Sequence, residues 1–305
     1  MKLTSKFCGL NFKNPLVLAS GVLGVTGETL LKVIRNGAGG VTTKSIWLKA
    51  HKGHKNPVMF SCGEVFMNAV GLSDAGFEKA KEEITIFKKK SSQPLIVNIV
   101  ASKIKDFGLL AKKISTLNPD LIEVNISCPN VEDEFGKPFA CDIFSAEKVV
   151  KIIRKNTKNN FSVKLSPNVN NIGEIAKACE AGGANAITAI NTVGPGMRIN
   201  IETKTPILKN KVGGISGPGI FPIAIKCVND IYRSVKLPII GIGGVKSGED
   251  AIEMMMAGAS LVGICTGVYL RGISVFKKVC QEMEKWSKKN NIKSLSEIIG
   301  SVKID

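Results

Sequence analysis

The stretch that decides the fold is DLIEVNISCPN, residues 120–130. Leu121, Ile122, Val124 and Ile126 make its first half apolar and rich in β-branched side chains. This composition is typical of a short strand with buried faces. Pro129 then interrupts the pattern, because a proline supplies no N–H to a strand ladder. The stretch therefore predicts a buried strand that ends near residue 127.

Polar groups gather where this strand ends. They are Asn125, Ser127, Cys128 and Asn130. A buried strand that ends in amides, a hydroxyl and a thiol is typical of a barrel that places its chemistry at the carboxyl ends of its strands. The alternative for Cys128 is a free cysteine packed as a small hydrophobic residue, and the stretch alone leaves both readings open.

Short apolar segments recur on both sides of this strand and alternate with amphipathic, helical ones. Strands are expected at 15–20, 40–45, 94–101, 121–127, 161–166, 186–192, 238–245 and 260–266, and helices at 26–36, 75–90, 104–117, 146–156, 172–181, 220–235, 249–257 and 273–289. Eight such strands predict an α/β fold, a (β/α)8 TIM barrel, as one domain over residues 1–305. An open doubly wound sheet is less favoured, because no GxGxxG follows the first strand.

Local signals refine this organisation. Residues 3–14 predict a hairpin with a Gly-Leu-Asn turn that plugs the closed end of the barrel. Ser247 and Asp250 have capping-box spacing. Gly37, Gly182 and Gly258 follow helical runs, where a left-handed residue is expected. The long segments 46–74 and 193–219, with the shorter 131–143, are expected as loops over the active face.

Composition excludes several classes of protein. The net charge is +17, from 42 Lys and Arg against 25 Asp and Glu. Most of the excess is lysine without arginine clusters or aromatic stacking motifs, so a solvated surface is favoured over nucleic-acid binding. No segment resembles a signal peptide or a membrane span, and none of the eight cysteines forms a CxxC pair. We therefore expect a cytoplasmic protein with reduced thiols and no metal site.

Two lysines at predicted strand ends need a counter-charge. Lys44 and Lys164 would be costly inside a barrel unless they meet negative charge. Glu123 is the one acidic side chain on a strand that could pair with either lysine. A single carboxylate can neutralise one lysine but hardly both, so we favour an anionic ligand as the counter-charge.

The last two strands make that ligand more specific. Gly243 and Gly244 follow the seventh strand, and Cys265, Thr266 and Gly267 follow the eighth. Exposed backbone N–H groups at these two ends form the usual phosphate pocket of a barrel. Together with small residues after the first strand and amides on the third and fourth, they predict a flat heteroaromatic phosphate such as FMN. A thiolate at Cys128 could then act as a base.

At this point the motifs resemble a known family. GVTTKS, MNAVGL, NISCPN, SVKLSPN, AINT, GGISGPG and GIGGV together look like the class 1 dihydroorotate dehydrogenases, over residues 14–267. MNAVGL and the run NTVGPGMRI resemble class 1B, the NAD-linked catalytic subunit. Class 2 enzymes differ, because they carry an N-terminal membrane helix and a serine where Cys128 stands.

The resemblance implies an activity and a role for each matching residue. The activity is oxidation of (S)-dihydroorotate to orotate in pyrimidine (UMP) biosynthesis, with Cys128 as base and hydride passing to FMN. Catalytic and substrate-binding residues would be Cys128, Lys44, Asn68, Ala69, Val70, Gly71, Leu72, Asn125, Asn191 and Thr192. One FMN would be held by Ser20, Lys44, Ser45, Asn98, Asn125, Lys164, Ile190, Gly217, Gly243, Gly244, Cys265 and Thr266.

The resemblance also implies an assembly, namely a homodimer joined by a subunit with FAD and a 2Fe–2S cluster as a heterotetramer. Two departures from the family stand out. Cys265 replaces the usual glycine beside the phosphate threonine, and residues 51–64 are unusually basic, with His51 and His54 expected as solvated loop residues. Alternatives are a fumarate-linked enzyme, a dihydropyrimidine dehydrogenase-like flavoenzyme, and a non-catalytic phosphate- or nucleic-acid-binding barrel.

Overall fold

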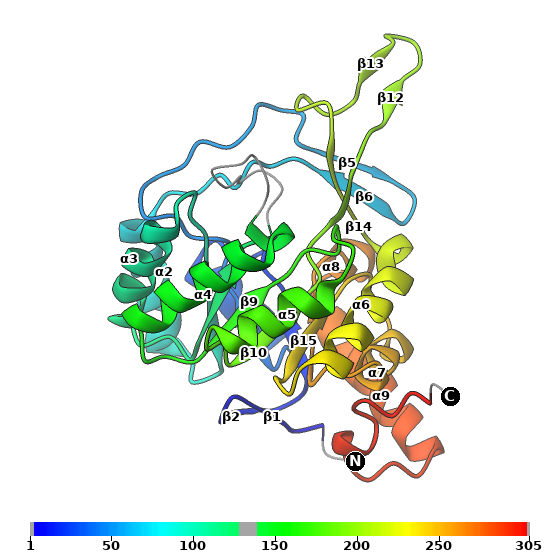
Figure 1. Ribbon diagram of the computed structural model, residues 1–305. Coiled ribbons are helices and arrows are strands. Elements are labelled where there is room, and N and C mark those ends of the chain that lie inside the picture. Colours follow the sequence, from blue (N-terminus) through cyan, green and yellow to red (C-terminus); the bar gives the residue numbers. More distant parts are fainter. Residues whose placement is uncertain (1–2, 128–138, 304–305) are drawn as a thin grey trace.

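The computed structural model describes residues 3–127 and 139–303. The predicted base Cys128 and most of the predicted 131–143 lid therefore lie outside the described residues. Eight parallel strands close into a barrel, which confirms the expected TIM-barrel architecture (Figure 1). Around the ring they are β3 (Leu16–Leu18), β4 (Gly40–Thr42), β7 (Leu95–Ile99), β8 (Leu121–Asn125), β9 (Phe161–Lys164), β10 (Ala186–Ala189), β15 (Ile239–Ile242) and β16 (Leu261–Ile264).

The expected helices surround this barrel (Figure 1). They are α1 (Gly27–Arg35), α2 (Phe77–Lys90), α3 (Ile104–Ser115), α4 (Ile143–Asn156), α5 (Ile172–Ala181), α6 (Phe221–Ser234), α7 (Gly248–Met256) and α9 (Val275–Lys289). A short additional helix, α8 (Gly267–Arg271), follows the last strand directly. No helix among the described residues is both long enough and apolar enough to span a bilayer.

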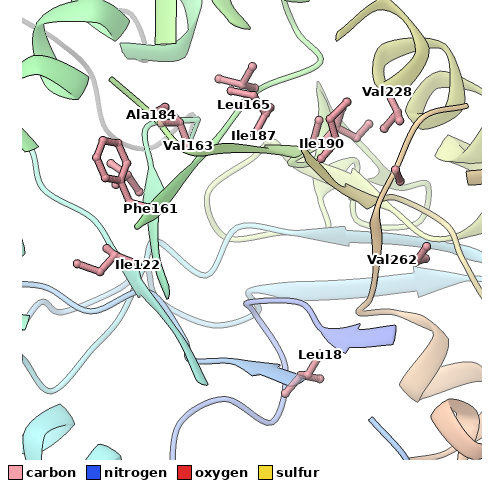
Figure 2. Packing of buried hydrophobic residues seen from close by; sticks show 14 of the residues in the cluster. Leu18, Ile122, Phe161, Val163, Leu165, Ala184, Ile187, Ile190, Val228 and Val262 are labelled. Carbon is pink, nitrogen blue, oxygen red and sulfur yellow. The ribbon is translucent and has the colours of Figure 1, made fainter. Parts of the chain in front are cut away.

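The barrel strands present alternate side chains to two different cores, as a period of two requires. Ile122, Phe161, Val163 and Ile187 belong to the larger cluster, which the helices complete (Figure 2). The opposite face of the strands contributes a second cluster inside the barrel. This alternation fixes which side chains at the strand ends can reach the lumen.

The N-terminal hairpin closes the bottom of the barrel, as expected. It consists of β1 (Ser5–Phe7) and β2 (Leu10–Phe12). Phe7 and Phe12 are 1% exposed and belong to the inner cluster. The predicted Gly-Leu-Asn turn was wrong: Cys8 and Gly9 make the turn with φ of 48° and 80°, and two positive φ values suit a two-residue hairpin.

Two of the three glycines expected to end helices do so in the left-handed region. Gly37 and Gly258 have φ of +106° and +125°. Gly182 follows α5 as expected, but its φ of −72° is right-handed, so the left-handed conformation predicted for it was wrong, and Gly183 takes it instead at +100°. The Ser247–Asp250 capping box is present at the start of α7.

The two long segments expected as loops form a small antiparallel sheet instead. Its order is β11 (Val193–Gly196), β14 (Gly213–Ser216), β6 (Val65–Asn68) and β5 (Met59–Cys62). A further pair, β12 (Ile199–Asn200) and β13 (Thr205–Pro206), projects away from the barrel (Figure 1). As expected, these segments lie over the active face of the barrel, since they share a cavity with the carboxyl ends of its strands.

Candidate active site

A cavity of about 620 Å³ lies between the carboxyl ends of the barrel strands and the covering sheet. It gathers most of the side chains predicted for the site. Those that line it are Ser20, Lys44, Ser45, Asn68, Val70, Gly71, Leu72, Asn125, Lys164, Ile190, Asn191, Thr192, Gly217, Gly243, Gly244, Cys265 and Thr266. Of the described residues predicted for the site, Ala69 and Asn98 do not line it, and both are buried.

Asn98 is fully buried near the carboxyl end of β7. Its Nδ2 donates to the Glu123 carboxylate on β8 at 2.5 Å, and its backbone N–H donates to Thr43 Oγ1 at 3.0 Å. The amide oxygen of Asn98 is buried without a recorded partner in the part of the chain that the structure describes. A buried acceptor without a donor is costly and marks a position where a donor is wanted.

Lys164 carries the least compensated charge of the site. It ends β9 beside Asn125 of β8 and is 5% exposed. Within residues 3–127 and 139–303, no hydrogen bond or ion pair to its ammonium is recorded. Burial raises the pKa of the Cys265 thiol, and the Lys164 charge opposes that rise. An ammonium buried this deeply needs an anion, so the base of the cavity is a site for one.

Lys44 follows β4, also lines the cavity and is partly buried. Its Nζ donates to Ser73 Oγ at 3.2 Å, so it points toward the segment that follows β6. Burial lowers the pKa of Lys44, and the negative charge of Asp74 partly counters this. Lys44 and Lys164 therefore present two cations to one cavity.

A chain of polar side chains connects β4, β8 and β10 at the strand ends. Asn125 Nδ2 donates to Ser45 Oγ at 3.2 Å, and Asn125 Oδ1 accepts from Ser127 Oγ at 3.1 Å. Asn191 Nδ2 donates to Ser127 Oγ at 2.9 Å. Ser127 was not among the predicted site residues, although it stands between two of them. This network fixes the orientation of both amides before any ligand binds.

Glycines form the cavity wall next to β15. Gly217, Gly243 and Gly244 have φ of +99°, +142° and +75°. A Cβ on Gly244 would lie 3.0 Å from the Gly217 carbonyl oxygen and 2.8 Å from Cβ of Phe221. Side chains are excluded here both by conformation and by space. The backbone itself can therefore approach a ligand.

Residues of the covering segments complete the cavity, and sequence patterns did not indicate them. His54 lies against Gly71, and its Nδ1 donates to the Ala69 carbonyl at 3.1 Å. It is exposed, as expected, yet it lines the cavity. Phe66 of β6 stacks on Tyr269 of α8 with 5.7 Å between ring centroids. The predicted loops gave no strand periodicity from which these positions could have been derived.

Fold and cavity define a class: a (β/α)8-barrel protein with a cationic, glycine-walled ligand site at the carboxyl ends of its strands. Comparison with known proteins identifies the family. The family model described as dihydroorotate dehydrogenase matches residues 2–286, and this chain belongs to that family. The family resemblance of the motifs is confirmed.

Two similar curated proteins carry the same name. The dihydroorotate dehydrogenase B (NAD(+)), catalytic subunit, of Methanocaldococcus jannaschii is 44% identical over 301 residues, which cover 98% of this chain and 97% of that protein. The protein of the same name from Pyrococcus abyssi is 42% identical over 292 residues, with 96% of each chain covered. The relatives are thus of the NAD-linked B type that the motifs predicted.

Proposed function

We propose that this chain is the catalytic subunit of an NAD-linked dihydroorotate dehydrogenase, which oxidises (S)-dihydroorotate to orotate in pyrimidine biosynthesis. The observation that carries the proposal is Lys164, a 5% exposed ammonium without a recorded counter-charge among the described residues, in the cavity of a chain from this family. An anionic cofactor and an anionic substrate account for the two lysines together.

The cofactor we propose is FMN. Two features of the chain fit it: the positive-φ glycines, whose backbone leaves room for a phosphate, and the buried cation of Lys164. The residues proposed to hold it are Ser20, Lys44, Ser45, Asn98, Asn125, Lys164, Ile190, Gly217, Gly243, Gly244, Cys265 and Thr266. Bound there, FMN would supply a two-electron acceptor for hydride. Lys164 would stabilise negative charge on the reduced ring.

The substrate is proposed to lie between Lys44 and the amide network. A dihydropyrimidine ring alternates C=O and N–H groups, and an amide side chain both accepts and donates. The residues proposed to bind it are Lys44, Asn68, Ala69, Val70, Gly71, Leu72, Asn125, Asn191 and Thr192. Lys44 would pair with the substrate carboxylate, which an uncharged dihydropyrimidine lacks. This pairing favours dihydroorotate over the substrates of a dihydropyrimidine dehydrogenase-like enzyme.

Cys128 is the proposed base. Oxidation of the ring removes a proton from one carbon and a hydride from its neighbour, so the proton needs an acceptor on the chain. A thiolate at Cys128 would take that proton and return it to solvent. Cys128 lies outside the described residues, and its role rests on its place directly after Ser127 in the NISCPN motif.

The assembly is part of the proposal. The relatives are named as catalytic subunits of NAD(+)-linked enzymes, which supports a partner subunit. We propose a homodimer of single FMN-binding barrel domains, joined in a cytoplasmic heterotetramer by a subunit with FAD and a 2Fe–2S cluster. In a fumarate-linked enzyme, purified protein alone would reduce fumarate. The NAD-linked enzyme requires the partner for NAD reduction.

The test is a pair of cysteine variants in FMN-loaded protein. Cys128→Ala should bind orotate normally and reduce its flavin with dihydroorotate about 10²–10⁴-fold more slowly. Cys62→Ala, which changes an exposed cysteine of β5, is the matched control and should react like the parent. Near-normal reduction in Cys128→Ala would remove Cys128 from the mechanism. A protein that neither contains nor takes up FMN would refute the proposed function.

A further inference from the structure

The turn after the substrate segment holds an acidic residue that the proposed chemistry does not use. Asp74 follows Ser73 directly, and Ser73 accepts the hydrogen bond from Lys44. Asp74 Oδ2 accepts from the backbone N–H of Gly76 at 2.8 Å and from that of Trp47 at 3.1 Å. One carboxylate oxygen therefore closes the turn and ties it to the chain that leaves β4.

Further contacts make this turn rigid. The backbones of His51 and Asp74 exchange two hydrogen bonds, at 2.8 and 2.9 Å. Trp47 Nε1 donates to the Leu72 carbonyl at 2.9 Å, and its ring stacks on His51 with 4.3 Å between centroids. Segment 46–54 thus holds segment 68–76 along its length. The place of Ser73, and with it the direction of Lys44, is set by this attachment.

Few other charged side chains can influence Lys44 at this end of the cavity. The titratable side chains that line the cavity in the described chain are Lys44, His54, Lys164, Cys265 and Tyr269. None of them is a carboxylate, and Glu123 lies below, bonded to Asn98. Burial lowers the pKa of Lys44, and Asp74 is the charge that opposes this shift. Lys44 has no other carboxylate at hand in the described residues.

We propose that Asp74 is a positioning residue for Lys44. Its carboxylate fixes the turn that carries Ser73, the partner of Lys44, and its negative charge attracts the Lys44 ammonium, so that the ammonium is directed to the site where an anionic substrate binds. Ser73 holds the ammonium until a substrate carboxylate replaces the hydroxyl as its partner. The inference rests on the proposed function for the identity of that carboxylate, though not for the effect of Asp74 on Lys44.

Asp74→Asn separates charge from geometry. The amide oxygen can still accept from Trp47 and Gly76, so the turn is retained while the charge is lost. Glu78→Gln removes one carboxylate from the exposed start of α2, where Glu78 faces Lys113, and controls for net charge. Ser73→Ala removes the hydroxyl that Lys44 contacts and leaves Asp74 in place.

The decisive readout is the protonation of Lys44 itself. Trace labelling of the FMN-loaded protein with a small amine reagent across pH, quantified on the Lys44 peptide, gives the midpoint at which Lys44 loses its proton. In Asp74→Asn the midpoint should fall below that of the parent, because the opposing charge is gone, and in Glu78→Gln it should stay at the parental value. An unchanged midpoint in Asp74→Asn would overturn the inference. If Asp74→Asn were to unfold, Ser73→Ala, which keeps the Asp74 charge, should retain the parental Lys44 midpoint, and a lowered midpoint in Ser73→Ala would overturn the inference.

The pH dependence of orotate affinity gives a second measurement. A purely structural role for Asp74 would leave this dependence unchanged. Orotate should bind the protonated form of Lys44, so its affinity should weaken as pH rises through the Lys44 midpoint. In Asp74→Asn this loss should begin at a lower pH than in the parent, with parental affinity retained at pH 6. A uniform loss at every pH would mean that Asp74 acts only through the turn. Failure of the parent protein to bind orotate would refute the proposed function, while the labelling result would still decide on Asp74.

Discussion

Glu123 accepts a hydrogen bond from Nδ2 of Asn98 at 2.5 Å inside the barrel, and both side chains are buried. Glu123 was the one internal acid that could have paired with a lysine. No ion pair joins it to Lys44 or Lys164 in the described chain. Among the described residues, Lys164 thus has no recorded counter-charge, and removing an ammonium from water without one is expensive. A bound anion is the simplest compensation.

Removing the charge of Lys164 should therefore weaken cofactor binding. Lys164→Met should lose FMN on gel filtration or hold it with a lower flavin reduction potential, because a fixed positive charge favours the reduced, more negative ring. Lys177→Met is the matched control, since Lys177 is an exposed lysine of α5 paired with Glu174. Full FMN occupancy with an unchanged potential in Lys164→Met would contradict the role given to this charge.

The Asn98–Glu123 pair should matter for stability. Glu123→Leu leaves the Asn98 amide without its acceptor in a buried site, and an unsatisfied buried group costs about 1–3 kcal/mol. Glu123→Gln keeps an acceptor for Nδ2 and should cost less. Urea unfolding of the two variants measures the difference. Equal free energies of unfolding in Glu123→Leu and the parent would mean that the hydrogen bond contributes nothing to the fold.

A methyl group on the glycine wall should shift the backbone that is proposed to face the cofactor phosphate. Gly244→Ala places a Cβ within 3.0 Å of the Gly217 carbonyl at φ of +75°, so FMN retention should fall at least tenfold. Gly272→Ala has nearly the same φ, +73°, and nothing within 4 Å of its Cβ. Both variants should lose about 1–2 kcal/mol of stability through the left-handed conformation, and Gly244→Ala should lose more, because its Cβ also lies 2.8 Å from Cβ of Phe221. Equal FMN affinity in the two variants would argue against a phosphate at Gly244.

An ion pair behind the glycine wall should give a pH-dependent contribution to stability. Arg271 binds Glu282 through both guanidinium nitrogens, and Gly248 N–H donates to the same carboxylate at 2.7 Å. The Arg271 hydrogen bond lowers the pKa of Glu282. A lowered folded-state pKa adds stability above the ordinary glutamate pKa, and this is lost as pH falls through the folded value.

Glu282→Gln should accordingly lower the free energy of unfolding at pH 7 by about 0.5–1 kcal/mol, a small value because solvent screens this partly exposed pair. The gap to the parent should close as pH falls below about 4. Glu253→Gln, an exposed carboxylate of α7, should show no such closing gap. A gap of constant size from pH 7 to pH 3.5 would contradict the assigned role of the charge.

The barrel was predictable because its signals are local. Each strand is a short apolar run between helices with recognisable starts, as Ser247 shows, and the carboxyl ends of eight such strands meet at one face. Most side chains proposed for the site follow from this rule alone. Asn98 does not line the cavity, because its amide turns toward Glu123, and a strand pattern specifies the face of a residue but not its hydrogen-bond partner.

The covering sheet was not predictable, because the signals that define its strands are not local. β14 is Gly-Gly-Ile-Ser and β11 is Val-Gly-Pro-Gly, compositions that indicate loops rather than strands. Their pairing depends on partners far away in the sequence, since Ile215 of β14 pairs with Met67 of β6. His54 reaches the cavity through the covering segments, and Tyr269 reaches it from α8, directly after β16. Their part in the site could be found only from the structure.

The central claim is that the cavity binds FMN and dihydroorotate together and passes hydride from one to the other. Anaerobic mixing of the FMN-loaded protein with dihydroorotate, followed by flavin absorbance, tests it most directly. The flavin band should bleach in a fast phase, with one orotate formed per FMN reduced. An oxidised flavin spectrum that persists in the presence of saturating dihydroorotate would contradict the claim.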